Sequence, residues 1–282
     1  MSTSPYYKRI SAKHPLFDLK IREVWNYRDL ILLFTKRNFT VSYKQTILGP
    51  LWLFLNPLLS SYIHMIIFGN IAGLSTDGIP RLLFYLTGTA VWGLFSSCLI
   101  GNSNTFTANA GLFGKVYFPR LTVSISNVLS NGIKFVIQFS MILFLILYYV
   151  MKGTVFPHWF LWFFIPVVLI QLGLLGMGIG IFISSITTKY RDLSVLVGFG
   201  VNLWMYATPV VYPISQLENS LLKKIILLNP VAAPMELFRY IVLGHGTILF
   251  ENLLISWAFT LILLLFAVMI FNHVERTFMD TV

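Results

Sequence analysis

The sequence predicts an all-α polytopic membrane protein, and three observations support that prediction. Of the 282 residues, 57% are apolar and only 11% are charged, whereas soluble domains carry about 25% charged residues. Six apolar blocks are long enough to cross the hydrocarbon core of a bilayer, which needs roughly 20 helical residues. The basic residues gather ahead of the first block. Because lipid offers backbone groups no partner and the blocks lack the alternation of barrel strands, each block should be a helix.

The six predicted spans divide the chain into loops that alternate between the two sides of a membrane. The spans lie near residues 52–72, 82–108, 121–150, 159–186, 193–213 and 252–272. Nine of the 20 Lys and Arg residues precede the first span, and alternation places five more on the same side. This positive-inside bias predicts that the N- and C-termini are both cytoplasmic. Residues 1–50 should form a cytoplasmic tail with an interfacial helix, and residues 51–282 a single six-helix domain.

Apolar residues recur at helical spacing before the first span. Val24, Tyr27, Ile31 and Phe34 follow one another at steps of three, four and three, while basic residues occupy other faces. The pattern predicts an amphipathic helix in the inner membrane interface. Such a helix is either a simple anchor or an element that follows the movement of a partner in the cytoplasm.

The segment 214–250 has apolar runs that are too short to span a bilayer. Asn229-Pro230 and Pro234 interrupt them. This pattern predicts short helices that dip partway into the membrane from the outer face, between the fifth and sixth spans. Broken helices at membrane depth occur where protein or a water-filled cavity covers them. We therefore expect these helices to line or close the outer mouth of a pathway, the alternative being an ordinary external loop.

A cytoplasmic loop after the second span carries glycines and a lysine but no nucleotide-binding motif. Gly111 to Val116 lacks the glycine spacing and the Ser or Thr of a phosphate-binding loop. The following stretch, Phe113 to Pro119, is aromatic and basic. Aromatic side chains outside the bilayer usually need a partner surface, so this stretch should contact another protein or fold back into the interface.

Other chemistries are not expected in this chain. The sequence holds no catalytic or metal-ligand motif, and its ten acidic residues fall in tails, loops or block ends. Carriers coupled to protons or sodium commonly place carboxylates at mid-membrane, so secondary transport is disfavoured. No basic stripe with interleaved aromatics lies on a soluble module, so no nucleic-acid partner is expected. The single cysteine, Cys98, lies inside an apolar block.

Polar and aromatic residues inside the spans are candidates for lining a passage. Lys134 falls near the middle of the third span, with Asn127 and Asn131 on the same helical face. This lysine either faces a passage, where it could attract a phosphate, or snorkels and pairs between helices. Most aromatic residues should form interface belts, but a subset could offer sugar rings flat surfaces. That subset is Tyr62, Trp92, Trp204 and Tyr206.

Four stretches in order along the chain resemble one known family. The run from Tyr43 to Trp52, followed by Asn56-Pro57-Leu58, is similar to the start of the first membrane helix in permeases of the type 2 ABC transporter family. The other stretches are Asn109 to Pro119, Lys189 to Leu193 with the downstream run Thr208 to Pro213, and Asn229-Pro230 with Arg239. Within that family, the pattern is most similar to exporters of O-antigen, capsule and teichoic acid.

The resemblance implies partners, a cargo and roles for particular residues. It implies a homodimer in membrane lipid with two copies of a separate ATPase subunit, which would bind the ATP and magnesium, so that this chain holds no cofactor. The cargo would be a polysaccharide on a polyprenyl diphosphate, entering near Arg37 and Lys44. The residues expected to contact the ATPase are Phe113, Gly114, Lys115, Tyr117, Phe118, Tyr190, Arg191 and Asp192. The residues expected to form the external gate are Pro209, Tyr212, Pro213, Asn229, Pro230 and Arg239.

Two other functions remain open at this stage. A drug or small-lipid exporter of the same superfamily would share the helices but would need no wide, aromatic-lined passage. A membrane-embedded transferase acting on polyprenyl phosphates would need acidic, metal-binding motifs in its cytoplasmic loops, and Asp192 alone does not supply one.

Overall fold

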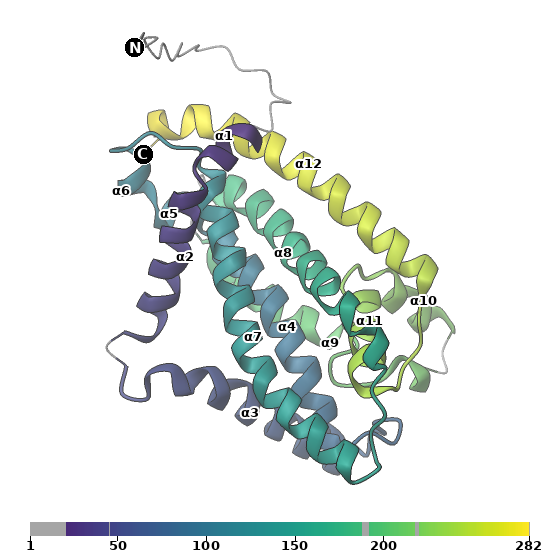
Figure 1. Ribbon diagram of the computed structural model, residues 1–282. Coiled ribbons are helices and arrows are strands. Elements are labelled where there is room, and N and C mark those ends of the chain that lie inside the picture. Colours follow the sequence, from purple (N-terminus) through teal and green to yellow (C-terminus); the bar gives the residue numbers. More distant parts are fainter. Residues whose placement is uncertain (1–20, 45, 188–191, 218–219, 282) are drawn as a thin grey trace, which may run out of the picture.

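The computed structural model describes residues 21–44, 46–187, 192–217 and 220–281, and every regular element in those residues is helical (Figure 1). The prediction of an all-α fold is confirmed. The longer helices are α2 (Arg28–Tyr43), α3 (Trp52–His64), α4 (Arg81–Ser103), α7 (Leu121–Met151), α8 (Ile165–Thr187), α9 (Leu193–Tyr206), α11 (Ala232–Leu243) and α12 (Phe250–Thr281). The shorter ones are α1 (Ile21–Asn26), α5 (Thr105–Ala108), α6 (Ala110–Phe113) and α10 (Ser220–Leu228), with 3-10 turns at Gly49–Leu51, Trp159–Phe164 and Ile214–Gln216 and a π-helical stretch at Met65–Ile71.

Among the residues that the structure describes, five helical stretches are long and apolar enough to cross a membrane. They are Gly49–Ile71, Arg81–Ser103, Leu121–Met151, Trp159–Thr187 and Phe250–Asn272. Each corresponds to one of the predicted spans. The helices Leu221–Leu228 and Ala232–Leu243 meet at 90°. If this bent pair is counted as one broken span, the total is six. The short, bent pair predicted between the last two blocks is therefore present.

The predicted span 193–213 is shorter than expected. Helix α9 ends at Tyr206 after 14 residues, which corresponds to about 21 Å of helix and falls short of a bilayer core of about 30 Å. The cause lies in the next residues, because Pro209 and Pro213 have no backbone N–H to continue a helix. The chain instead turns irregularly before Ile214.

Helices α4 and α8 form the centre of the bundle. Their membrane-crossing stretches are 78% and 61% buried, against 22% or less for the other three. Glycines on α8 explain the close packing, because a Cβ at Gly176 would lie 2.7 Å from the Phe95 carbonyl oxygen and one at Gly180 would lie 2.5 Å from that of Leu99. Small residues allow helices to approach closely in lipid, where apolar burial gives no driving force between them.

The amphipathic helix before the first span is confirmed as α2, extended at its start by α1. Val24, Ile31 and Phe34 are buried, as the spacing predicts, and α2 packs against α7. Two contacts show that the helices run in the same direction: the Thr35 hydroxyl lies 3.4 Å from the Ser126 carbonyl oxygen, and Ser42 bonds to Lys134 further along. Helix α2 thus follows the first half of α7, and its depth in a membrane stays a prediction.

Different elements of the chain form the two ends of the bundle (Figure 1). At one end, α1 and α6 lie near the last turns of α12, and Phe106 stacks on Phe271 with ring centroids 4.5 Å apart. At the other end of α7, the backbone N–H of His158 donates to the carbonyl oxygen of Ile241 in α11 at 3.0 Å. The 31 residues of α7 separate these ends by about 46 Å.

Candidate functional site

A polar cavity of about 500 Å³ opens between α2, α4 and α7. We call it the Arg37 cavity, after the predicted substrate residue on α2 that lines it. Helix α7 contributes Asn127, Ser130 and Lys134, and Asn109 closes the side toward α5 and α6. The cavity therefore reaches from the end of the bundle that carries α6 to the middle of α7.

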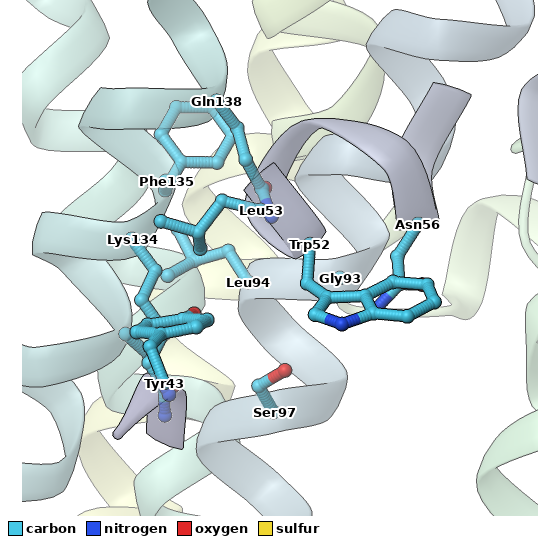
Figure 2. Close-up of a pocket in the computed structure, with 11 residues that line it drawn as sticks. Tyr43, Trp52, Leu53, Asn56, Gly93, Leu94, Ser97, Lys134, Phe135 and Gln138 are labelled. Atoms are coloured by element: carbon cyan, nitrogen blue, oxygen red, sulfur yellow. The ribbon is translucent and has the colours of Figure 1, made fainter. Parts of the chain in front are cut away.

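A second cavity of about 210 Å³ lies beyond Lys134, among α2, α3, α4 and α7 (Figure 2). We call it the Trp52 pocket. Figure 2 shows the rings of Tyr43 and Trp52 on either side of Ser97, with the Lys134 side chain next to Tyr43. Three amide side chains also line the pocket: Asn56, Asn131 and Gln138.

Lys134 is common to both cavities. Its Nζ donates a hydrogen bond to Ser42 Oγ at 3.1 Å and lies 5.9 Å from the centroid of the Tyr43 ring. Among the residues that the structure describes, no carboxylate lines either cavity. The cavities therefore carry the positive charge of Lys134 and Arg37 without a lining acidic partner.

The helical repeat of α7 explains why these polar groups point in the same direction. Residues 127, 131, 134 and 138 follow at steps of four, three and four, which place side chains on one face of a helix. Asn131 Nδ2 donates to Asn127 Oδ1 at 2.8 Å and links adjacent turns of this face. On α2, burial raises the pKa of Tyr43 above its usual range, so its phenol is neutral at physiological pH.

The structure divides the predicted entrance and lining residues into two groups. Arg37, Asn127, Asn131 and Lys134 line the two cavities. Lys44 follows the end of α2 and is exposed, but it lines neither cavity. Trp92 is buried, with Phe95 and Trp204 in ring contact at 5.1 Å and 6.3 Å. Tyr62 and Tyr206 are about half exposed, on α3 and α9; their role in a passage stays a prediction.

The predicted gate residues converge on Arg239, whose side chain is almost completely buried. Its Nη1 donates to the Pro209 carbonyl and, at 3.0 Å, to Glu236 Oε1, while Nη2 donates to the Val210 carbonyl at 2.6 Å. Its Cζ lies 4.1 Å from the centroid of the Phe84 ring on α4. Gly88 of α4 makes room for the Val210 carbonyl that Arg239 binds, because a Cβ at this position would lie 2.7 Å from the Val210 oxygen. We call this group the Arg239 cluster.

The remaining gate residues join the same region. Asn229 Nδ2 donates to Thr208 Oγ1 at 2.8 Å, and Asn229 Oδ1 accepts from the Val231 N–H at 3.1 Å. Ser256 of α12 donates to the Pro230 carbonyl at 2.5 Å. Tyr212 donates to the Tyr206 carbonyl at 3.3 Å, and Pro213 immediately precedes the 3-10 turn Ile214–Gln216. The segment after α9 is thus tied to α11 and to the turn before it, and that turn is tied to α12. The role of these segments as a gate stays a prediction.

The predicted coupling loop is only partly accessible. Phe113 and Phe118 are buried in an aromatic cluster with Phe34 and Phe106, and their own ring centroids lie 5.7 Å apart. Gly114, Lys115 and Tyr117 are exposed, and they lie at the α6 end of the bundle. Gly114, Lys115 and Tyr117 are therefore accessible to a partner, whereas the buried rings of Phe113 and Phe118 are not. Asp192 is exposed at the start of α9, whereas Tyr190 and Arg191 lie outside the described residues.

Sequence reasoning missed several residues of the site. Gln138 was within reach, since it continues the face of Asn127, Asn131 and Lys134 by four residues. Glu236 precedes Arg239 by three residues, a spacing that predicts their ion pair in a helix. No local signal predicts that Tyr43 and Trp52 share a pocket with α7, because their contact depends on how α2, α3 and α7 pack. No three His, Cys, Asp or Glu side chains gather in a possible metal site within the described part of the chain.

A helical membrane domain with an open, positively charged cavity between its helices is an architecture that suits a transporter's membrane component. The sequence matches the family described as ABC-2 type transporter over residues 29–243, and the chain belongs to that family. It is an integral membrane protein with several spans, the permease component of a transporter that works with an ABC ATPase. The matched family domain is a membrane component and is not the ATPase domain.

Curated relatives match almost the whole chain. An O-antigen export system permease protein RfbA from Myxococcus xanthus is 29% identical over 263 residues, which cover 93% of this chain and 98% of that protein. A protein of the same name from Klebsiella pneumoniae is 30% identical over 253 residues, covering 89% and 94% respectively. The similarity therefore includes the helices that form both cavities and the Arg239 cluster.

Proposed function

We propose that this chain is the permease of an exporter that moves polysaccharide, carried on a polyprenyl diphosphate, outward across a bacterial inner membrane. The observation that carries the proposal is the near full-length similarity to permeases named for O-antigen export. The Arg37 cavity supports it, because two cations line it, no carboxylate is among its described lining residues, and such a cavity suits a phosphate-bearing cargo.

The proposed assembly is a homodimer with two copies of a separate ATPase, which bind ATP and magnesium. The ATPase docks at the end of the bundle with the exposed residues Lys115 and Tyr117, and both termini of the permease face the cytoplasm. The Arg239 cluster, at the other end, belongs to the outer gate. ATP binding favours one arrangement of the ATPase pair and hydrolysis releases it, so the docked segments transmit the change to the helices.

A deletion strain tests this function. Removing the gene for this chain should abolish the surface polysaccharide and leave the polyprenyl-linked glycan inside the cell, measured by immunoblotting of whole and lysed cells. Deleting the gene of the partner ATPase should give the same phenotype, and restoring the permease should reverse it. Unchanged surface polysaccharide with loss of drug or small-lipid efflux would instead identify the alternative exporter.

A further inference from the structure

We propose that the Arg37 cavity and the Trp52 pocket form one two-chamber site for a sugar 1-diphosphate, with the diphosphate in the first chamber, the sugar ring in the second and Lys134 between them. The inference rests on the proposed function and deepens it. It assigns to the permease itself the recognition of the sugar that joins the glycan to its carrier.

Lys134 lies near the middle of α7, one of the helices long and apolar enough to cross a membrane. It lies 13 residues from the start of α7 and 17 from its end, so each end is about 20 Å or more away along the helix. A lysine side chain is too short to reach either end of the helix. Its hydrogen bond to the Ser42 hydroxyl supplies no negative charge. Because a cation within a membrane-spanning bundle is costly without a counterion, an anionic ligand would stabilise the site.

The Arg37 cavity has the chemistry to bind a diphosphate. Arg37 and Lys134 supply two positive charges, and Asn109, Asn127 and Ser130 supply neutral donors around them. Charge-assisted hydrogen bonds to phosphate oxygens are about twice as strong as neutral ones. The cavity volume of about 500 Å³ falls within the range of roughly 300–1,000 Å³ typical of small-molecule sites.

The Trp52 pocket has a different chemistry, suited to a sugar ring. Tyr43 and Trp52 offer aromatic surfaces for the C–H groups of a pyranose. Asn56, Asn131 and Gln138 carry both donors and acceptors, which match sugar hydroxyls in either role. Its volume of about 210 Å³ is below the usual range for drug-sized ligands, so it suits one ring better than a chain of rings.

The arrangement of the chambers leaves room for the rest of the cargo. Trp52, Asn56 and Ser97 are exposed, so the pocket is open on that side and a glycan could continue outward from a bound ring. The Arg37 cavity extends in the opposite direction, toward Asn109 and the α6 end. The diphosphate with its carrier and the glycan would therefore extend from Lys134 in opposite directions.

Binding to the purified permease–ATPase complex in nanodiscs tests the site. Three lipid probes with the same polyprenyl chain would be used: the free alcohol, the diphosphate, and the diphosphate bearing a hexose or an N-acetylhexosamine. The wild-type complex should bind the alcohol weakest, the diphosphate more tightly and at least one sugar diphosphate tightest. Lys134→Met should reduce binding of both diphosphate classes roughly tenfold to hundredfold, the effect of losing a charge-assisted hydrogen bond. Lys152→Met, an exposed lysine just past the end of α7, is the matched control and should bind like wild type.

Variants on the lining of each chamber distinguish the sugar chamber from the diphosphate chamber. Trp52→Ala and Gln138→Ala should remove the advantage of the sugar probe while leaving the plain diphosphate bound as in wild type. Arg37→Gln should weaken both diphosphate classes, and Arg28→Gln, an exposed arginine at the start of α2, should weaken neither. Lys134→Arg should retain diphosphate binding, which shows that charge rather than packing is lost in Lys134→Met.

The outcomes distinguish this inference from the proposed function. If no sugar diphosphate binds better than the alcohol to wild type, the proposed function fails and the inference fails with it. If the sugar diphosphate binds but Lys134→Met binds it equally well, only the site is wrong. If Trp52→Ala and Gln138→Ala retain the sugar advantage, the second chamber is wrong. Displacement of the diphosphate probe by an equal fraction of phosphatidylglycerol would show that Lys134 binds ordinary lipid headgroups, and would overturn the proposal.

Discussion

The buried Arg239 and the partly exposed Lys134 lie in very different surroundings in this molecule. Arg239 contacts a carboxylate, two backbone carbonyls and an aromatic ring, and almost none of it is exposed. Lys134 contacts one hydroxyl and the Tyr43 ring, and it lies at the junction of two open cavities. A cation that protein groups already satisfy holds segments together, whereas a cation facing a cavity without a carboxylate is available to a ligand. Substitutions should therefore damage the fold at Arg239 and binding at Lys134.

The largest loss of stability is expected for Arg239→Leu. It would leave Glu236 buried without its partner and free the Pro209 and Val210 carbonyls, so unfolding should become easier by about 3–5 kcal/mol. Thermal unfolding of the purified protein in detergent would measure the loss. The double variant with Glu236→Leu should recover part of it, because no uncompensated charge remains. An Arg239→Leu protein as stable as wild type would contradict a structural role for the cluster.

A smaller loss is expected where α4 meets α8. The added methyl of Gly180→Ala would lie 2.5 Å from the Leu99 carbonyl oxygen, so the helices must separate at a cost of about 1–3 kcal/mol. Gly198→Ala is the matched control, since its Cβ would enter open space within α9. The control should be neutral or slightly stabilising, because alanine favours a helix more than glycine does. Equal melting temperatures for the two variants would show that α4 and α8 pack less closely.

The smallest effect on stability is expected at the exposed part of the coupling loop. Tyr117→Asp should change stability by less than about 0.5 kcal/mol, as surface substitutions usually do, yet release the ATPase on co-purification. Phe156→Asp changes an exposed aromatic at the other end of α7 and should leave the complex intact. Retention of the ATPase by the Tyr117 variant would remove this loop from the proposed interface. Phe118→Asp cannot serve this purpose, because Phe118 is buried in the aromatic cluster.

The sequence predicted the parts of the structure that depend on local composition and periodicity. Long apolar blocks gave five spans, and the spacing from Val24 to Phe34 gave the buried face of α2. The end of α9 was placed seven residues too far along, because apolar composition continues through Thr208 to Pro213 while the backbone cannot remain helical there.

The candidate site was predicted only in part, for a physical reason. Asn127, Asn131 and Lys134 share a face of one helix, so their spacing identified them. Trp92 shows the limit of such reasoning: an aromatic residue in a span can line a passage or fill the core, and only its contacts with Phe95 and Trp204 distinguish the two. The pairing of Arg239 with residues 209 and 210 likewise depends on tertiary packing.

Transport by the reconstituted complex tests most directly whether Lys134 binds the cargo during export. Proteoliposomes containing the permease and its ATPase would be given a polyprenyl-diphosphate glycan, and its appearance on the far side would be followed with and without ATP. We expect ATP-dependent movement for wild type and Lys152→Met, and a loss of at least about tenfold for Lys134→Met with its melting temperature unchanged. Undiminished transport by a stable Lys134→Met complex would contradict the account.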